Sequence, residues 1–107
     1  MQEIDITPGQ VVYSKAGRDR YRYFVVLEIL ENDYVLISDG ETRPIERPKR
    51  KKLKHLTVHN MVASDIKNKI ESNSKIMNSD IRDSLKSMGL VNQLKGKEVS
   101  GTIGKWS

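Results

Sequence analysis

Cysteine is absent from this 107-residue chain, and aromatic residues make up only 6% of it. The lack of cysteine excludes disulfides, cysteine-ligated metal sites and thiol catalysis, and it fits a reducing compartment. No apolar run approaches the roughly 20 residues that cross a membrane. Residues 1–5 are acidic and show no apolar core of a secretory signal. We therefore expect a cytoplasmic protein with no membrane partner.

Apolar residues are also scarce, at 36% of the chain, which excludes a large core. Their clustering argues against a disordered chain. The formal net charge of +5 is unevenly spread, because residues 43–54 hold seven basic side chains and one acid, whereas residues 28–41 hold five acids and no base. Such a concentration of positive charge makes nucleic acid the first partner to consider.

The first half of the chain shows short apolar segments separated by turn residues. We expect strands at Gln10–Ser14, Tyr21–Leu30, Tyr34–Ser38, Thr42–Ile45 and around His55–Val58. Asp39-Gly40 predicts a type I′ hairpin, in which both central residues have positive φ. Pro44 and Pro48 should keep the fourth strand at a sheet edge, because proline has no N–H to donate. Strands at this spacing predict a small barrel or sandwich.

The second predicted strand is apolar on both faces. Tyr23 and Val25 fall on one face, whereas Phe24 and Val26 fall on the other. Either another element covers the outer face, or an aromatic side chain is exposed for binding.

After Asn60 the apolar period becomes helical. We expect one helix to start at Ser64–Asp65, a break at Glu71–Ser74, and a second helix to start at Asn78–Asp80, followed by Gly89 in a left-handed conformation. The apolar stripes are narrow, enough to dock both helices on the outer face of the barrel. We divide the chain into a β domain (1–59), a helical extension (60–94) and a flexible tail (95–107).

Two basic segments are candidates for binding. The first is the polar loop after the first strand, where four cations surround Gly17: Lys15, Arg18, Arg20 and Arg22. Arginine and lysine can contact phosphates, and neighbouring tyrosines can stack on unpaired bases. An ordinary solvated loop with core aromatics is the alternative.

The second segment is the basic run Arg47-Pro48-Lys49-Arg50-Lys51-Lys52-Leu53-Lys54-His55. Its like charges repel, so we expect it to be extended or disordered in solution. On RNA, neutralising six phosphates gives a log–log salt slope of about −4 for single strands. The run offers little base readout, and the alternatives are a solubilising face or a sorting signal.

Catalytic motifs are absent. His55 and His59 are the only histidines, in a segment that looks extended and lacks a third ligand, so we expect no metal. There is no phosphate loop, nucleophile elbow or dinucleotide fingerprint. We expect no enzymatic activity, no cofactor and no small-molecule substrate.

The run from Gly9 to Val26 resembles a KOW motif, and the pattern continues through Tyr34–Gly40 to Pro48–Leu56. Residues 8–57 resemble the small bacterial KOW-domain RNA-binding proteins, which are similar to KOW-class large-subunit ribosomal proteins of archaea and eukaryotes. The resemblance implies an SH3-like β-barrel without enzymatic activity that binds structured RNA, most often ribosomal RNA. It assigns the KOW loop to Lys15, Arg18, Arg20 and Arg22, and the basic segment to Lys49–Lys54.

This chain has Tyr21 where the family usually has glycine. Glycine would allow positive φ at no steric cost, which predicts a wider or shifted loop here and adds a stacking ring.

We conclude that the chain is mainly β, a small SH3-like (KOW) barrel followed by a helical region and a tail. We expect a ribosome-associated RNA-binding protein that contacts ribosomal RNA, with ribosomal proteins as further partners. The expected RNA-binding residues are Lys15, Arg18, Arg20, Tyr21, Arg22, Arg47, Lys49, Arg50, Lys51, Lys52, Lys54 and His55. The alternative is a protein–protein adaptor barrel of the transcription or translation apparatus. Duplex DNA binding is weaker, since no basic recognition helix is visible.

Overall fold

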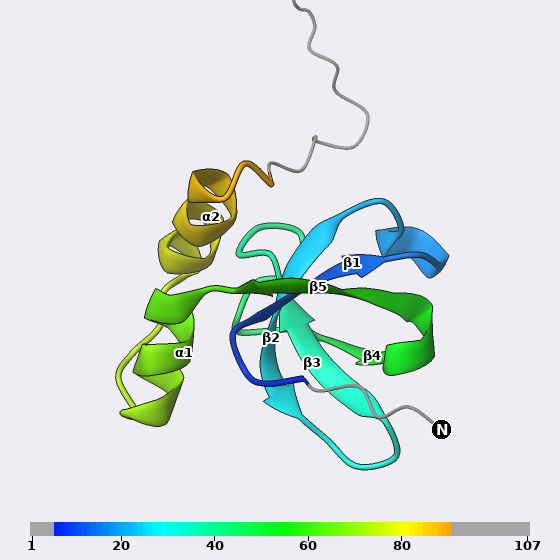
Figure 1. Ribbon diagram of the computed structural model, residues 1–107, viewed down its shortest axis with the longest axis horizontal. Helices are drawn as coiled ribbons and strands as arrows, with labels where there is room; N and C mark the ends of the chain where they lie inside the picture. Colours follow the sequence, from blue (N-terminus) through cyan, green and yellow to red (C-terminus); the bar gives the residue numbers. More distant parts are fainter. Residues whose placement is uncertain (1–5, 91–107) are drawn as a thin grey trace, which may run out of the picture.

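The computed structural model describes residues 6–90, which form one five-stranded antiparallel sheet followed by two helices (Figure 1). The sheet order is β4-β3-β2-β1-β5. The strands are β1 (Gln10–Ser14), β2 (Tyr23–Ile29), β3 (Tyr34–Ser38), β4 (Lys49–Lys52) and β5 (Leu56–Val62). Two short 3₁₀ turns, η1 (Gly17–Asp19) and η2 (Leu53–His55), precede β2 and β5, and the helices are α1 (Ser64–Glu71) and α2 (Asn78–Ser87). The mainly β class with a helical C-terminal part is confirmed.

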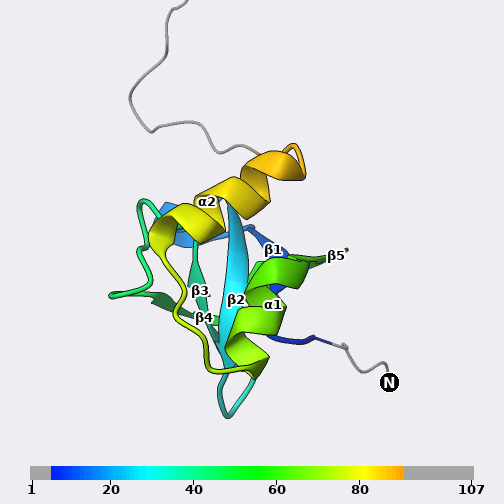
Figure 2. The ribbon, with the colours of Figure 1, turned by 90° about the vertical axis from the view of Figure 1, so that its left-hand side faces the viewer.

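Both faces of the sheet are buried, which is the first of the two alternatives left open by the apolar residues on both faces of β2. One face carries a core of Val12, Phe24, Val26, Val35, Ile37 and Leu56. The other face packs Val11 and Val25 against Ala63 and three helical residues, Ile66, Ile81 and Leu85. Figure 2 shows α1 and α2 lying in front of β2 and β1. The helices therefore cover the outer face of the sheet, as their narrow apolar stripes predicted.

Strand pairing does not close the sheet. The order begins at β4 and ends at β5, and the three residues of η2 connect these two edges. The closed SH3-like barrel expected from the sequence is thus not shown by the hydrogen bonding.

The position of the fourth strand was predicted wrongly. Residues 42–45 form bends and turns, and the strand is the basic segment Lys49–Lys52, which was expected to be extended or disordered. Backbone groups of the 42–45 segment bond elsewhere: the Arg43 N–H donates to Asp39 Oδ1 and the Ile45 N–H to Asn78 Oδ1. β4 instead pairs with β3, placing Val35 opposite Lys51 and Leu36 opposite Arg50.

The type I′ turn lies at a different place from the one predicted. Asn32 and Asp33, between β2 and β3, both have positive φ, 62° and 65°. At the predicted site only Gly40 has positive φ, 74°. The Asp39 carboxylate there accepts hydrogen bonds from the loop that follows, which favours an Asx-type turn over a two-residue hairpin.

The helix boundaries agree with the sequence. α1 begins at Ser64, α2 begins at Asn78, and Gly89 has a φ of 77° after the end of α2. β5 runs on to Val62, four residues beyond the predicted Val58. Neither helix in residues 6–90 is long and apolar enough to cross a membrane. The predicted tail, 95–107, lies outside the described residues.

Candidate nucleic-acid interface

The two basic segments, 25 or more residues apart in the sequence, lie side by side. Two hydrogen bonds join them: Lys51 Nζ donates to the Ala16 carbonyl oxygen at 2.9 Å, and the Lys15 N–H donates to the His55 carbonyl oxygen at 2.9 Å. In Figure 1, η1 and η2 lie at the end of the sheet remote from α1 and α2. The fold therefore gathers both segments at one end of the molecule.

A buried carboxylate fixes the loop between β1 and β2. Asp19 is 4% exposed, and its Oδ1 accepts a hydrogen bond from Arg43 Nε at 2.9 Å. Arg43 Nη2 approaches Asp19 Oδ2 at 3.3 Å, and Lys51 Nζ lies 3.7 Å from the same oxygen. Burial tends to raise the pKa of Asp19, but the hydrogen bond from Arg43 and the charges of Arg43, Lys51 and Lys49 lower it overall.

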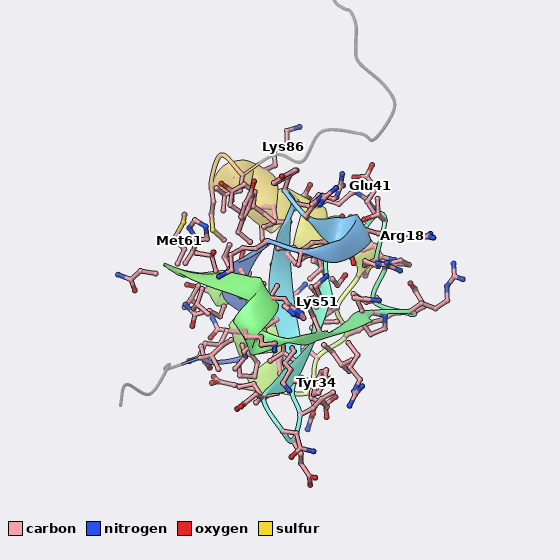
Figure 3. The ribbon with its side chains drawn as sticks, turned by 90° about the vertical axis from the view of Figure 1, so that its right-hand side faces the viewer. Arg18, Tyr34, Glu41, Lys51, Met61 and Lys86 are labelled. Atoms are coloured by element: carbon pink, nitrogen blue, oxygen red, sulfur yellow. The ribbon has the colours of Figure 1, made fainter. Side chains whose placement is uncertain are left out.

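The anchoring of Asp19 leaves its two basic neighbours at the surface. Arg18 and Arg20 are both exposed on either side of the buried carboxylate. Figure 3 looks onto this end of the molecule, with Lys51 near the centre and Arg18 at the rim. The loop thus presents cations outward while its one acid is neutralised inside.

Tyr21 adopts a left-handed backbone conformation, which glycine reaches at no steric cost. Its φ is 70°, its N–H donates to the Ser14 carbonyl oxygen at 2.8 Å, and the Ser14 N–H donates to the Arg22 carbonyl oxygen at 2.9 Å. A tyrosine therefore occupies the left-handed region itself, so the predicted widening or register shift is not required. The residue is 71% exposed, and the Arg20 guanidinium carbon lies 5.6 Å from the centroid of its ring.

Arg22 points into the protein. It is 7% exposed, and its Nη2 lies 3.1 Å from Asp39 Oδ2 in a buried ion pair. The same oxygen accepts a hydrogen bond from Thr42 Oγ1 at 2.7 Å, while Asp39 Oδ1 accepts the Glu41 and Arg43 N–H groups. In this arrangement Arg22 holds the β3–β4 loop in place and presents no charge to a partner.

The four basic residues of β4 divide between two faces, because side chains alternate along a strand. Lys51, opposite Val35, is 7% exposed and reaches inward to Ala16 and Asp19. Arg50 is on the outer face, stacked on the Tyr34 ring with its guanidinium carbon 3.8 Å from the centroid, and Lys52 Nζ lies 5.5 Å from the same ring. Tyr34 therefore holds two cations at the surface.

The remaining predicted residues keep their side chains at the surface. We call this set the basic surface: Lys15, Arg18, Arg20, Arg47, Lys49, Arg50, Lys52, Lys54 and His55, of which Lys49 and Lys52 are half-buried. Arg22 and Lys51 are excluded from it because both are buried in ion pairs.

Sequence reasoning missed Asp19, Asp39, Arg43 and Tyr34 as the residues that organise this end of the molecule. The available signal was the alternation of side-chain direction along a strand. If the four cations of Lys49–Lys52 form a strand, some of them point toward the protein interior and need an acid as a partner. Which acid that is depends on the tertiary fold, because Asp19 lies far from β4 in the sequence.

No group of three metal-ligating side chains occurs among the described residues. His59 contacts aromatic rings instead, with its centroid 5.4 Å from that of Tyr23 and 6.3 Å from that of Tyr13. His55 is exposed on the basic surface.

Comparison with known proteins gives one informative match. The chain is 31% identical over 70 residues to "Putative ribosome-binding protein YbzG" of Bacillus subtilis (strain 168), covering 65% of this chain and 95% of that protein. No protein-family model matches the chain.

Proposed function

Because this chain belongs to the same family as YbzG of Bacillus subtilis, we propose that it is a non-catalytic, cytoplasmic, ribosome-associated protein that contacts ribosomal RNA through its basic surface. The relative is named for ribosome binding, and the basic surface supplies the chemistry by which such a protein would hold RNA. RNA carries a negatively charged phosphate at each nucleotide, and clustered arginine and lysine side chains neutralise these phosphates.

One observation carries this proposal: the loop 15–21 and the segment 47–55 meet at a single end of the fold through the Lys51–Ala16 and Lys15–His55 hydrogen bonds. The pairing of β1 with β5, which sets Ser14 opposite Leu56, brings the segments together and so concentrates their positive charge at one end of the fold, where a polyanion can bind it. The resemblance to KOW domains supports the same assignment, since it too places RNA contacts in this loop and this segment.

The charge of the basic surface predicts how binding should depend on salt. Six of its lysine and arginine residues are exposed: Lys15, Arg18, Arg20, Arg47, Arg50 and Lys54. If each neutralises one phosphate, the logarithm of the RNA association constant should fall with the logarithm of salt concentration with a slope of about −4 for single-stranded RNA.

Co-sedimentation with ribosomes tests the proposal. The test variant is Arg18→Gln/Lys54→Gln, because both side chains are exposed and one comes from each segment. The matched control is Lys75→Gln/Lys86→Gln, which removes the same charge from exposed positions in the helical part. In Figure 3, Lys86 projects at the top beside α2.

We expect the test variant to release ribosomes at lower salt than the wild-type protein, and the control variant to match the wild type. Equal release by all three proteins would contradict the proposal. Binding that survives ribonuclease digestion of the ribosome would instead indicate a protein contact, as for an adaptor.

A further inference from the structure

Tyr21 combines three properties that a structural residue rarely shows together. Its backbone lies in the left-handed region, it is 71% exposed, and it belongs to neither hydrophobic core. Left-handed φ places Cβ close to the carbonyl oxygen and costs free energy for most residues, tyrosine among them, whereas glycine and, to a lesser degree, asparagine tolerate it. Because the ring lies outside both cores, burial in a core does not offset this cost, and a role in binding is the alternative to a role in packing.

The backbone around Tyr21 holds the ring in place. The Tyr21 N–H donates to Ser14, whose own N–H donates to Arg22, and the Arg22 guanidinium is buried against Asp39. On the other side, Asp19 is buried against Arg43. Tyr21 therefore lies between a buried ion pair, Arg22–Asp39, and a partly buried one, Arg43–Asp19, which fix the turn on both sides. A ring presented on a turn fixed in this way loses less entropy when it binds.

The surroundings of the ring indicate what it binds. Arg18 and Arg20 are exposed beside it, and Lys15 lies at the start of the same loop. Phosphates on these cations would bring the nucleotide chain past the ring. An exposed aromatic ring among phosphate-binding cations is the arrangement in which proteins stack on an unpaired base.

Resting on the proposed function, we infer that Tyr21 stacks on a nucleobase, so that the RNA recognised by this protein presents an unpaired base beside the phosphates held by Arg18 and Arg20. The strained conformation is then part of the binding site, kept at the expense of stability. A fully paired helix would engage the basic surface alone.

Two short RNA hairpins test the inference, one with a single bulged 2-aminopurine and one fully paired. Tyr21→Phe keeps the ring, whereas Tyr21→Gly and Tyr21→Asn remove it and suit a left-handed backbone. We expect the wild-type protein and Tyr21→Phe to bind the bulged hairpin at least about fivefold more tightly than either ring-deleted variant. All four proteins should bind the paired hairpin equally, and stacking should quench the 2-aminopurine fluorescence.

Thermal unfolding gives the second readout. Removing the strain should leave the midpoint of Tyr21→Gly equal to that of the wild type or up to about 8 °C higher. A lower midpoint for both Tyr21→Gly and Tyr21→Asn would show that the ring supports the fold and would overturn the inference.

The charge variant separates this inference from the proposed function. If Arg18→Gln/Lys54→Gln weakens binding to both hairpins but the ring-deleted variants bind both like the wild type, the stacking inference fails and RNA binding stands. A loss of equal size on both hairpins from ring deletion would also overturn the stacking inference. If neither the charge nor the ring affects binding, both proposals fail.

Discussion

Lys51 Nζ donates a hydrogen bond to the carbonyl oxygen of Ala16 at 2.9 Å, and so ties the edge strand β4 to the loop between β1 and β2. This contact assigns different tasks to neighbouring cations of one strand. Lys51 is buried and supports the basic surface from inside the fold, whereas Arg50 and Lys52 belong to that surface and lie beside Tyr34. Replacing the whole basic run at once would therefore mix a stability effect with a binding effect.

The first prediction separates these two effects within the run. Lys51→Gln removes the buried ammonium group that lies beside Asp19 and donates to the Ala16 carbonyl oxygen. The substitution should therefore lower the free energy of unfolding by about 2 kcal/mol. Lys54→Gln, at an exposed position, should change it by less than about 0.5 kcal/mol. Urea unfolding of the two variants measures the difference, and equal stabilities would contradict the assignment of Lys51.

The second prediction concerns the buried ion pair of Arg22 and Asp39. Removing one partner leaves the other charge buried and unpaired, so Arg22→Gln should destabilise the fold by about 3 kcal/mol. Arg20→Gln is the matched control, because Arg20 is exposed in the same loop. The control should keep the thermal midpoint of the wild type. An Arg22→Gln protein that is as stable as the wild type but binds RNA more weakly would contradict this structural role and would place Arg22 among the RNA-binding residues.

The third prediction concerns pH and Asp19. Its pKa in the folded protein is lowered, so the unfolded chain binds the proton more readily in acid. The stability that Asp19 contributes is therefore complete above the unfolded pKa, about 3.9, and is lost as pH falls through the lower folded value. Below about pH 4, the wild-type protein should lose this contribution with a measurable slope.

Asp19→Asn tests that dependence. The variant should be less stable than the wild type at pH 7, and the difference between the two should shrink as the pH falls below about 4. Urea unfolding at a series of pH values measures both effects. A difference that stays constant down to pH 2 would contradict the role given to the Asp19 carboxylate.

The fourth prediction concerns the helical cover of the sheet. Ile81 in α2 is fully buried in the core that includes Val11 and Val25, so Ile81→Ala should cost about 2–5 kcal/mol. Met77, just before α2, is 54% exposed, and Met77→Ala should be nearly neutral. Thermal unfolding compares them. If both were neutral, the helices would not be part of the folded unit.

Local pattern was sufficient to predict most strands and both helices. Breaker residues flanking short β-prone segments predicted the strands Gln10–Ser14 and Tyr34–Ser38 with their observed bounds. The two apolar faces of β2 left open either a covering element or an exposed aromatic, and the structure has the covering element. These features depend on residues close together in the chain, so they can be predicted from the sequence.

The errors involve partners distant in the sequence. Mutual repulsion predicted an extended or disordered run at Lys49–Lys52, with the fourth strand at Thr42–Ile45. The acid that neutralises Lys51, Asp19, lies more than two dozen residues away in the sequence. The Asp39-Gly40 dipeptide is typical of a hairpin turn. In the fold, Asp39 instead forms a buried ion pair with Arg22, a partner that the local sequence does not indicate. For the same reason, pattern alone could not tell buried from exposed cations in the candidate site.

Ultraviolet crosslinking in cells, followed by sequencing of the attached RNA, tests the central claim most directly. We predict that crosslinks gather on one or two segments of ribosomal RNA, and that Arg18→Gln/Lys54→Gln reduces their yield whereas Lys75→Gln/Lys86→Gln does not. Near-absence of crosslinks from a wild-type protein that still sediments with ribosomes would contradict the claim, because the contact would then be with ribosomal protein.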